Sequence, residues 1–207
     1  MDYLRDPKVI YARSFAAIRA EADLSHLPAG AHGIALRVIH ACGMTDIARD
    51  LRITPDFAEA AQAALRAGKP LIVDAEMLRH GIINRQLPKG VEIVCTLNDP
   101  RARDLGIARQ ATRSAAAVEL WAPHLAGAVV VIGNAPTALF ALLEAIDKGA
   151  RKPAAIAGFP VGFVGAAESK DELIRNPRGI PYATLLGRRG GSAMAAAVVN
   201  ALTGDNS

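Results

Sequence analysis

The sequence predicts an α/β protein with a doubly wound parallel sheet of five strands and helices on both faces. Five short, almost wholly apolar runs have the length of buried strands, and segments with helical patterning separate them. A strand–helix–strand series implies right-handed crossovers, which make the strands parallel and cover both faces of the sheet. We find no internal repeat, linker or low-complexity segment, so residues 1–207 are expected to form one domain.

Three helices are expected before the first strand. Asp6 caps the first, and Pro7 takes its opening position, where the missing N–H has no helical partner to lose. The second runs over residues 29–42 and ends at Gly43, and the third covers residues 54–68 between clear start and stop signals. These helices are expected to pack beside or around the sheet.

Strands and helices then alternate. The strands are expected at residues 70–75, 91–97, 128–132, 154–159 and 182–186. The helices among and after them are expected at residues 75–80, 113–121, 135–148, 168–175 and 191–202. Ligands of such sheets bind past the carboxyl ends of the strands. The candidate site is therefore expected among residues 74–76, 97–99, 133–137, 158–170 and 187–192.

The composition argues against several classes of protein. Apolar residues make up 51% of the chain, yet no stretch approaches the length of a membrane-spanning helix. The formal net charge is +4, but no dense basic run with interleaved aromatic residues is present, which argues against nucleic acid binding. The N-terminus has no apolar signal core. Cys42 and Cys95 have neither metal-ligand nor disulfide spacing, and they fit a reducing cytoplasm.

Arginine outnumbers lysine by 18 to 6. The rigid guanidinium fork suits carboxylates and phosphates, so the excess is consistent with an anionic ligand. A genome biased toward Ala and Arg explains the same excess equally well.

Three loops at the expected carboxyl edge are unusual. Residues 133–137 open a helix whose N–H groups could hold an anion, but we favour an ordinary capped turn. Residues 186–192 are rich in glycine without nucleotide-binding spacing, and close packing of the backbone, on itself or on a flat ligand, explains them better. Residues 160–170 are apolar, which indicates a lid, a subunit contact or a wall for a hydrophobic ring.

The sharpest feature is the pair Arg37 and His40 ahead of Gly43. Three residues apart on a helix, the two side chains share a face. The C-terminal end of a helix favours the protonated form of His40, whereas the positive charge of Arg37 disfavours it. An anionic ligand between the two side chains would again favour the protonated form. His40 is therefore a candidate general acid near neutral pH. The alternative is a surface or capping histidine, which is the commoner role of a lone histidine.

Other catalytic classes lack their motifs. The remaining histidines, His26, His32, His80 and His124, give no metal-binding spacing, which argues against metal catalysis. No Gly-x-Ser-x-Gly elbow of a serine hydrolase is present.

Five strings in order resemble the precorrin-8X methylmutase (precorrin isomerase) family. They are RVIHACG at 37–43, DAEM at 74–77, TRSAA at 112–116, IGNAPTAL at 132–139 and GFPVGFVGAAESK at 158–170. Residues 11–15 and 188–194 fit the family as well. The resemblance covers nearly the whole chain and is highly specific.

The resemblance implies a flavodoxin-like fold, a homodimer and an isomerase of cobalamin biosynthesis. The family moves a methyl group from C11 to C12 of precorrin-8X, giving hydrogenobyrinate, by a [1,5]-sigmatropic shift, and its anaerobic branch acts on the cobalt-containing ring. Because the shift is intramolecular and redox-neutral, no metal, nucleotide or other cofactor is expected. No nucleic acid or membrane partner is expected either.

The resemblance also assigns site residues. The family's catalytic histidine falls on His40, and its substrate-contacting serine and arginine fall on Ser14 and Arg37. Arg113 matches a further arginine beside the site, and Asn134 is assigned by its place in the string IGNAPTAL. The substrate carries acetate and propionate arms, for which arginines and helix N-termini are suitable partners.

Two other functions stay open at this point. A tetrapyrrole carrier would bind the ring without turning it over. A nucleotide-binding enzyme could use the same class of sheet, since doubly wound sheets host many chemistries. That second alternative needs a phosphate loop after the first strand, where Asp74 and Glu76 are acidic.

Overall fold

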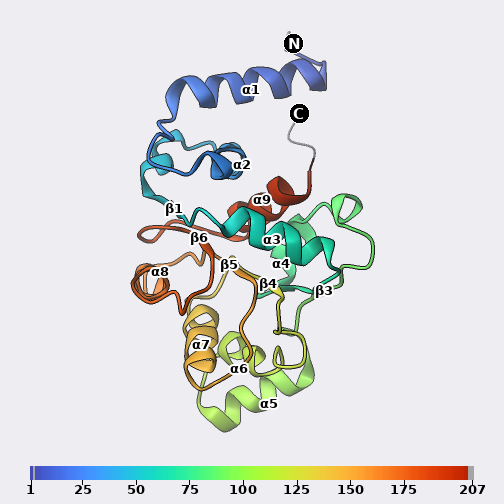
Figure 1. Cartoon of the computed structure of the whole chain (residues 1–207), viewed down its shortest axis with the longest axis vertical. Coiled ribbons are helices and arrows are strands. Elements are labelled where there is room, and N and C mark those ends of the chain that lie inside the picture. Colours follow the sequence, from blue (N-terminus) through green and yellow to red (C-terminus); the bar gives the residue numbers. More distant parts are fainter. Residues whose placement is uncertain (2, 205–207) are drawn as a thin grey trace.

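The computed structural model describes residue 1 and residues 3–204, and over these residues its centre is a mixed sheet of six strands (Figure 1). In spatial order the strands are β1 (Leu51–Ile53), β6 (Tyr182–Leu185), β5 (Ala155–Gly158), β4 (Val129–Ile132), β2 (Leu71–Val73) and β3 (Ile93–Val94). The five predicted strands, β2 to β6, are all present and mutually parallel. Their order, 3-2-4-5-6, is that of flavodoxin-like sheets.

The predicted number of strands was too low, because β1 adds a sixth at the edge of the sheet. β1 runs antiparallel to β6, with Leu51 opposite Leu185 and Ile53 opposite Ala183. Its three residues are too few to show a strand pattern, and Thr54-Pro55 directly after them is typical of a helix start. Only the pairing with β6, far along the chain, makes this segment a strand.

The helices follow the predicted order, with one addition. They are α1 (Pro7–Glu21), α2 (His32–Cys42), α3 (Phe57–Arg66), α4 (Glu76–Gly81), α5 (Pro100–Arg109), α6 (Arg113–Glu119), α7 (Pro136–Asp147), α8 (Ala166–Arg175) and α9 (Ser192–Thr203), with 3-10 turns η1 (Ala29–Ala31), η2 (Thr45–Asp50) and η3 (Asn84–Gln86). Helix α5 was not predicted from the sequence. Its start signal is nonetheless that of α1: Asp99 Oδ1 accepts a hydrogen bond from the Arg101 N–H at 2.9 Å, and Pro100 follows the cap.

Alternate residues of the five parallel strands face two separate apolar cores. Val129 and Val131 of β4 join the core that contains α2, α3 and α9, whereas Val130 and Ile132 join the core that contains α6, α7 and α8. Strands β2 to β5 are apolar throughout because both of their faces are buried, whereas β1 carries Arg52 and β6 carries Thr184. The prediction of helices on both faces is confirmed.

Helices α1 and α2 form two further layers outside α9 (Figure 1). α2 packs on α9, and α1 packs on α2. α2 ends as predicted, because Gly43 adopts a left-handed conformation with φ of 69° and its N–H donates to the Ile39 carbonyl at 2.8 Å. Within residues 1 and 3–204, no helix has the length and apolar character to cross a bilayer.

Candidate active site

The imidazole of His40 lies against two aromatic rings of α1. Its centroid is 5.0 Å from that of Phe15, with the ring planes 24° apart, and 5.9 Å from that of Tyr11. His40 is in the last turn of α2, as predicted, and it remains exposed to solvent. The protein therefore supports the imidazole from the side of α1 and leaves it accessible to a ligand.

The guanidinium of Arg37 belongs to the same cluster. Its Cζ lies 5.6 Å from the centre of the Tyr11 ring, within cation–π range. Tyr11 thus contacts both Arg37 and His40, which confirms that these two side chains share one face of α2. The guanidinium also reaches the C-terminal end of α9, since a Cβ built on Gly204 would lie 3.4 Å from Arg37 Nη2.

Ser14 lies on α1, half-buried, one turn after Tyr11 and next to Phe15 in the sequence. Helical spacing places Ser14 and Tyr11 on the same side of α1. We call Tyr11, Ser14, Phe15, Arg37 and His40 the α1–α2 cluster. It contains three of the five predicted site residues, together with two aromatic residues that position them.

The turn that carries Asn134 is held by the carboxylate of Asp74. Asp74 is buried at the end of β2 and accepts hydrogen bonds from the backbone N–H groups of Gly133, Asn134 and Ala135 at 2.8–3.0 Å. Burial raises the pKa of Asp74, and the three hydrogen bonds oppose this shift. An anion site made of these N–H groups is excluded, because Asp74 already accepts their hydrogen bonds. The favoured capped turn is present, but its cap is this distant carboxylate, since Ala135 at the N-cap of α7 offers no side-chain hydrogen bond.

Arg113 is exposed at the start of α6, beside the start of α7. Thr112 caps α6 by accepting a hydrogen bond from the Ala115 N–H at 3.2 Å, and its hydroxyl donates to the hydroxyl of Thr137 on α7 at 2.8 Å. Arg113 and Arg103 both line a hollow of about 350 Å³. Two guanidinium groups at one hollow are suited to a carboxylate.

The structure does not gather all five predicted residues within one chain. The α1–α2 cluster lies in the outermost helical layers, at one end of the longest axis (Figure 1). α6, which begins at Arg113, packs on the opposite face of the sheet, toward the other end of that axis. Arg113 is therefore separated from His40 by α9 and the sheet.

Asn134 lies between the α1–α2 cluster and Arg113, and the length of α9 estimates its distance from Arg37. A Cβ at Gly133 would lie 2.8 Å from Ser192 Cα at the start of α9, whereas Arg37 reaches the end of the same helix. The 12 residues of α9 span about 18 Å. Asn134 and the Arg37 guanidinium are thus separated by roughly the length of α9.

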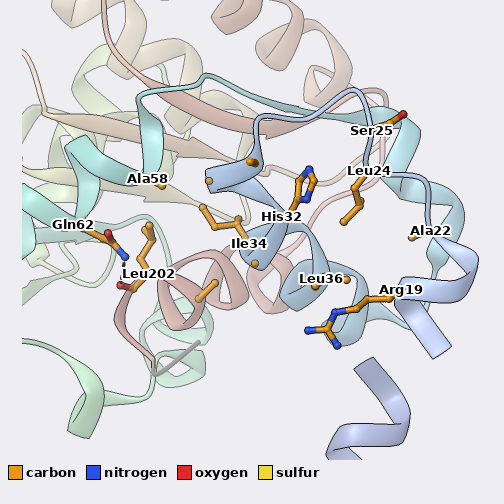
Figure 2. A pocket seen from close by; sticks show the side chains of 14 residues that line it. Arg19, Ala22, Leu24, Ser25, His32, Ile34, Leu36, Ala58, Gln62 and Leu202 are labelled. Atoms are coloured by element: carbon orange, nitrogen blue, oxygen red, sulfur yellow. Dashed lines mark hydrogen bonds between the residues drawn. The ribbon is translucent and has the colours of Figure 1, made fainter. Parts of the chain in front are cut away.

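A hollow opens between the first two helices and the core helices beneath them (Figure 2). Its volume is about 670 Å³, and it lies between the end of α1, the start of α2 and parts of α3 and α9. Arg19 and Leu36 line it: the Arg19 Cζ is 5.9 Å from the Phe15 ring, and Leu36 is one turn before His40. His40 is not among the residues that line this hollow.

A family model described as precorrin-8X methylmutase matches residues 9–204 of the chain. The chain belongs to the precorrin-8X methylmutase family. A precorrin-8X methylmutase from Sinorhizobium is 56% identical over 201 residues, which cover 97% of this chain and 96% of the relative. A precorrin-8X methylmutase from Pseudomonas aeruginosa is 56% identical over 202 residues, which cover 98% of this chain and 97% of the relative.

A solved structure of the precorrin-8X methylmutase from Thermus thermophilus superposes with a TM-score of 0.84 at 35% identity, covering 95% of this chain and 94% of that one. Six relatives named cobalt-precorrin-8 methylmutase are 32% to 38% identical to the chain. The relatives named for the ring without cobalt are thus the more similar group.

Two of the strings shared with the precorrin-8X methylmutase family form loops that pack together. The Gly191 N–H donates to the Phe159 carbonyl at 2.8 Å, and the Gly162 N–H donates to the Arg188 carbonyl at 3.2 Å. A Cβ on Gly190 would collide with the Phe159 carbonyl oxygen, so this position requires glycine. Close packing of the backbone, expected from the glycines, is confirmed.

The tip of the first loop is uncovered within one chain. Phe163 and Val164 are 87% and 88% exposed, and Arg188 Cζ lies 5.3 Å from the centre of the Phe163 ring. Exposed patches of large apolar side chains commonly mark binding sites or subunit interfaces. The tip of the apolar loop is thus exposed in one chain, and its role as a lid, a subunit contact or a wall for a hydrophobic ring stays a prediction.

The side chains beside the imidazole and behind the Asn134 turn were not predicted as part of the site. Tyr11 and Phe15 recur at helical spacing on α1, and this signal could have marked them as the face that meets α2. No local signal identifies the partners of Asp74, because Gly133 and Ala135 are far from it in the sequence. Among the residues that the structure describes, no group of three or more His, Cys, Asp and Glu side chains could hold a metal ion.

Proposed function

We propose that this chain isomerises precorrin-8X to hydrogenobyrinate by moving a methyl group from C11 to C12. The α1–α2 cluster carries the proposal: an exposed imidazole lies on fixed aromatic rings beside a guanidinium, in a member of the precorrin-8X methylmutase family. The identity of 56% with relatives named for precorrin-8X, against 32–38% with those named for the cobalt ring, supports the metal-free substrate.

In this proposal His40 is the proton donor. The protonated imidazole donates to the macrocycle, which lowers the electron density along the migration path and favours the tautomer of the product. General acid catalysis contributes roughly a hundred- to ten-thousand-fold in rate. Stacking on Phe15 restricts the imidazole before the substrate arrives, so less orientational freedom is lost in the transition state.

The other assigned residues bind the substrate. Arg37 and Arg113 pair with acidic arms of the ring, and Ser14 and Asn134 supply hydrogen bonds. The shift exchanges no electrons and transfers no atoms to another molecule, so we assign no cofactor. Cys42 and Cys95 form no disulfide in the described part of the chain, in keeping with a protein of the cytoplasm, where we place it. We treat residues 1–207 as one domain.

We also propose that the working unit is a homodimer whose sites draw on both subunits. Val9, Ile10 and Tyr11 on α1 are exposed, as are Phe163 and Val164 on the apolar loop. A second copy that covers these side chains would bury apolar surface. It would also bring the α1–α2 cluster of one chain toward Arg113 of the other, which a single chain keeps apart.

Turnover is the direct test of the activity. Precorrin-8X is mixed with a substoichiometric amount of the purified protein, and the migrated methyl group is followed by NMR and absorbance. An isomerase converts all of the substrate, whereas a carrier leaves it unchanged beyond one equivalent per site. Addition of ATP or NAD to the protein is expected to cause no thermal shift, and a shift would favour the nucleotide-binding alternative.

Mixing two impaired variants tests the shared site, at a substrate concentration too low for the variant that lacks Arg113 to bind the ring. Sedimentation should first give twice the 21.7 kDa of one chain. His40→Ala and Arg113→Ala are then dissociated together and reassociated. Half of the dimers are mixed, and each mixed dimer holds one intact site, so about a quarter of the wild-type rate should return. A site built within one chain predicts no recovery, because every mixed dimer then lacks a complete site.

A further inference from the structure

Arg189 joins the loop after β6 to the segment that follows α2. Its Nη1 donates to Asp46 Oδ2 at 2.7 Å, and its Nη2 donates to Asp50 Oδ2 at 2.9 Å. Both carboxylates belong to η2, far from Arg189 in the sequence. One guanidinium therefore closes two charge-assisted hydrogen bonds between separate parts of the fold.

The main chain of Arg189 is itself fixed. The carbonyl of Arg189 accepts a hydrogen bond at 2.6 Å from Nζ of Lys170, a wholly buried side chain of α8. The next residue, Gly190, packs directly on the carbonyl oxygen of Pro160, which a Cβ there would approach to 2.6 Å. The guanidinium is thus presented from a loop that has little freedom to move.

The segment held by Arg189 leads directly to His40. Three residues separate His40 from Met44, the residue just before η2. At the other end of η2, the Asp50 carbonyl accepts a hydrogen bond from the N–H of Leu186, the residue after β6, at 2.9 Å. The imidazole of His40 is also stacked on Phe15 of α1, but α1 packs on α2 and not on the sheet, so this contact does not tie His40 to the sheet. Arg189 is therefore a side-chain link from the loop after β6 to η2, the segment that directly follows the C-terminal turn of α2.

We infer that Arg189 is a positioning residue for His40. By holding Asp46 and Asp50 it fixes the last turn of α2 against the loops at the carboxyl edge of the sheet, and so sets where the imidazole meets the ring. This inference rests on the proposed function, because its readout is the methyl shift. Small displacements of a catalytic group lower the rate much more than they lower binding.

The test compares Arg189→Gln with Arg49→Gln. Arg49 lies in η2 and approaches Asp50 at only 3.9 Å from an exposed position, so it is a matched control. Arg189→Gln should lower kcat about tenfold or more, while the Kd for hydrogenobyrinate changes less than about threefold. Arg189→Lys should recover part of kcat through one remaining ion pair, and Arg49→Gln should match wild type.

A cycle with the partner carboxylates completes the test. Asp46→Asn combined with Asp50→Asn should reproduce the loss in kcat, and adding Arg189→Gln should cause little further loss, because all three changes remove the same link. If Arg189→Gln keeps the kcat of the wild type, or loses kcat and product affinity to the same extent, the role inferred for Arg189 is wrong while the proposed function stands. Absence of turnover in both wild type and Arg49→Gln would instead overturn the proposed function.

Discussion

The imidazole of His40 is stacked on the ring of Phe15, with the centroids 5.0 Å apart and the planes 24° apart. Phe15 is one of only two residues that α1 buries, so the ring beneath the imidazole is fixed by the packing of α1 on α2. A general acid must point at its acceptor to be effective, and this stack orients the imidazole.

Replacing Phe15 by Leu should slow the reaction. The aliphatic side chain keeps most of the buried volume but removes the stack, which is worth roughly 0.5–1.5 kcal/mol, so we expect kcat to fall about two- to tenfold. Phe140→Leu, on α7 on the other side of the sheet, is the matched control. Steady-state kinetics of both variants give the comparison, and an unchanged kcat in Phe15→Leu would show that the stack has no part in orienting His40.

His40→Ala should abolish turnover and preserve tight binding of the ring. The substitution removes the proposed proton donor, whereas the arginines that pair with the acidic arms are untouched. Turnover is measured with precorrin-8X, and affinity is measured by titration with hydrogenobyrinate. If the variant turns over at a near-normal rate, the role assigned to His40 is wrong.

Arg37→Ala should weaken substrate binding. The loss of one charged hydrogen bond to a carboxylate corresponds to about 1.5–3 kcal/mol, or roughly a ten- to hundredfold rise in Kd. Titration with hydrogenobyrinate measures it directly. An unchanged Kd would assign Arg37 to packing or to the subunit contact, through its contact with Tyr11.

Asp74→Ala should destabilise the fold strongly. It leaves the N–H groups of Gly133, Asn134 and Ala135 without their acceptor, and each unpaired buried donor costs about 1–3 kcal/mol. We expect a loss of at least about 3 kcal/mol in the free energy of unfolding, measured in urea. Asp104→Ala, an exposed position on α5, is the control. A loss no larger than that of the control would mean that water replaces the carboxylate.

Lys170 should make stability depend on pH. Burial lowers its pKa from 10.5 to about 8. Between these values the unfolded chain holds a proton that the folded chain has released, so this residue makes the folded state more stable as the pH rises. Burial raises the pKa of Cys95 to about 11, which acts in the opposite direction, so the comparison must be with a variant of Lys170.

Lys170→Met has no proton to lose and supplies that comparison. The free energy of unfolding of the variant, relative to that of the wild type, should be higher at pH about 7 than at pH about 10. The reason is that only the wild-type fold becomes more stable when the Lys170 amine releases its proton. Urea unfolding of both proteins at the two pH values measures the difference. A difference that does not change with pH would show that the Lys170 amine keeps its ordinary pKa in the fold.

Much of the architecture could be predicted because its signals are local. Strands β2 to β6 are apolar runs buried on both faces, and α1 and α2 carry their own start and stop residues, Asp6-Pro7 and Gly43. The helical period also placed Arg37 and His40 on one face. The helix α5 was within reach as well, because Asp99-Pro100 repeats the signal of Asp6-Pro7.

The sequence by itself thus determined the α/β class, the parallel strands and the pair on α2, since each depends on residues a few positions apart. Only the tertiary structure decided that β1 pairs with β6, that Asp74 fills the turn before α7, and that Arg189 holds η2. It also separated Arg113 from the α1–α2 cluster. The physical reason is common to all four: each depends on contacts between segments distant along the chain, which no local pattern encodes.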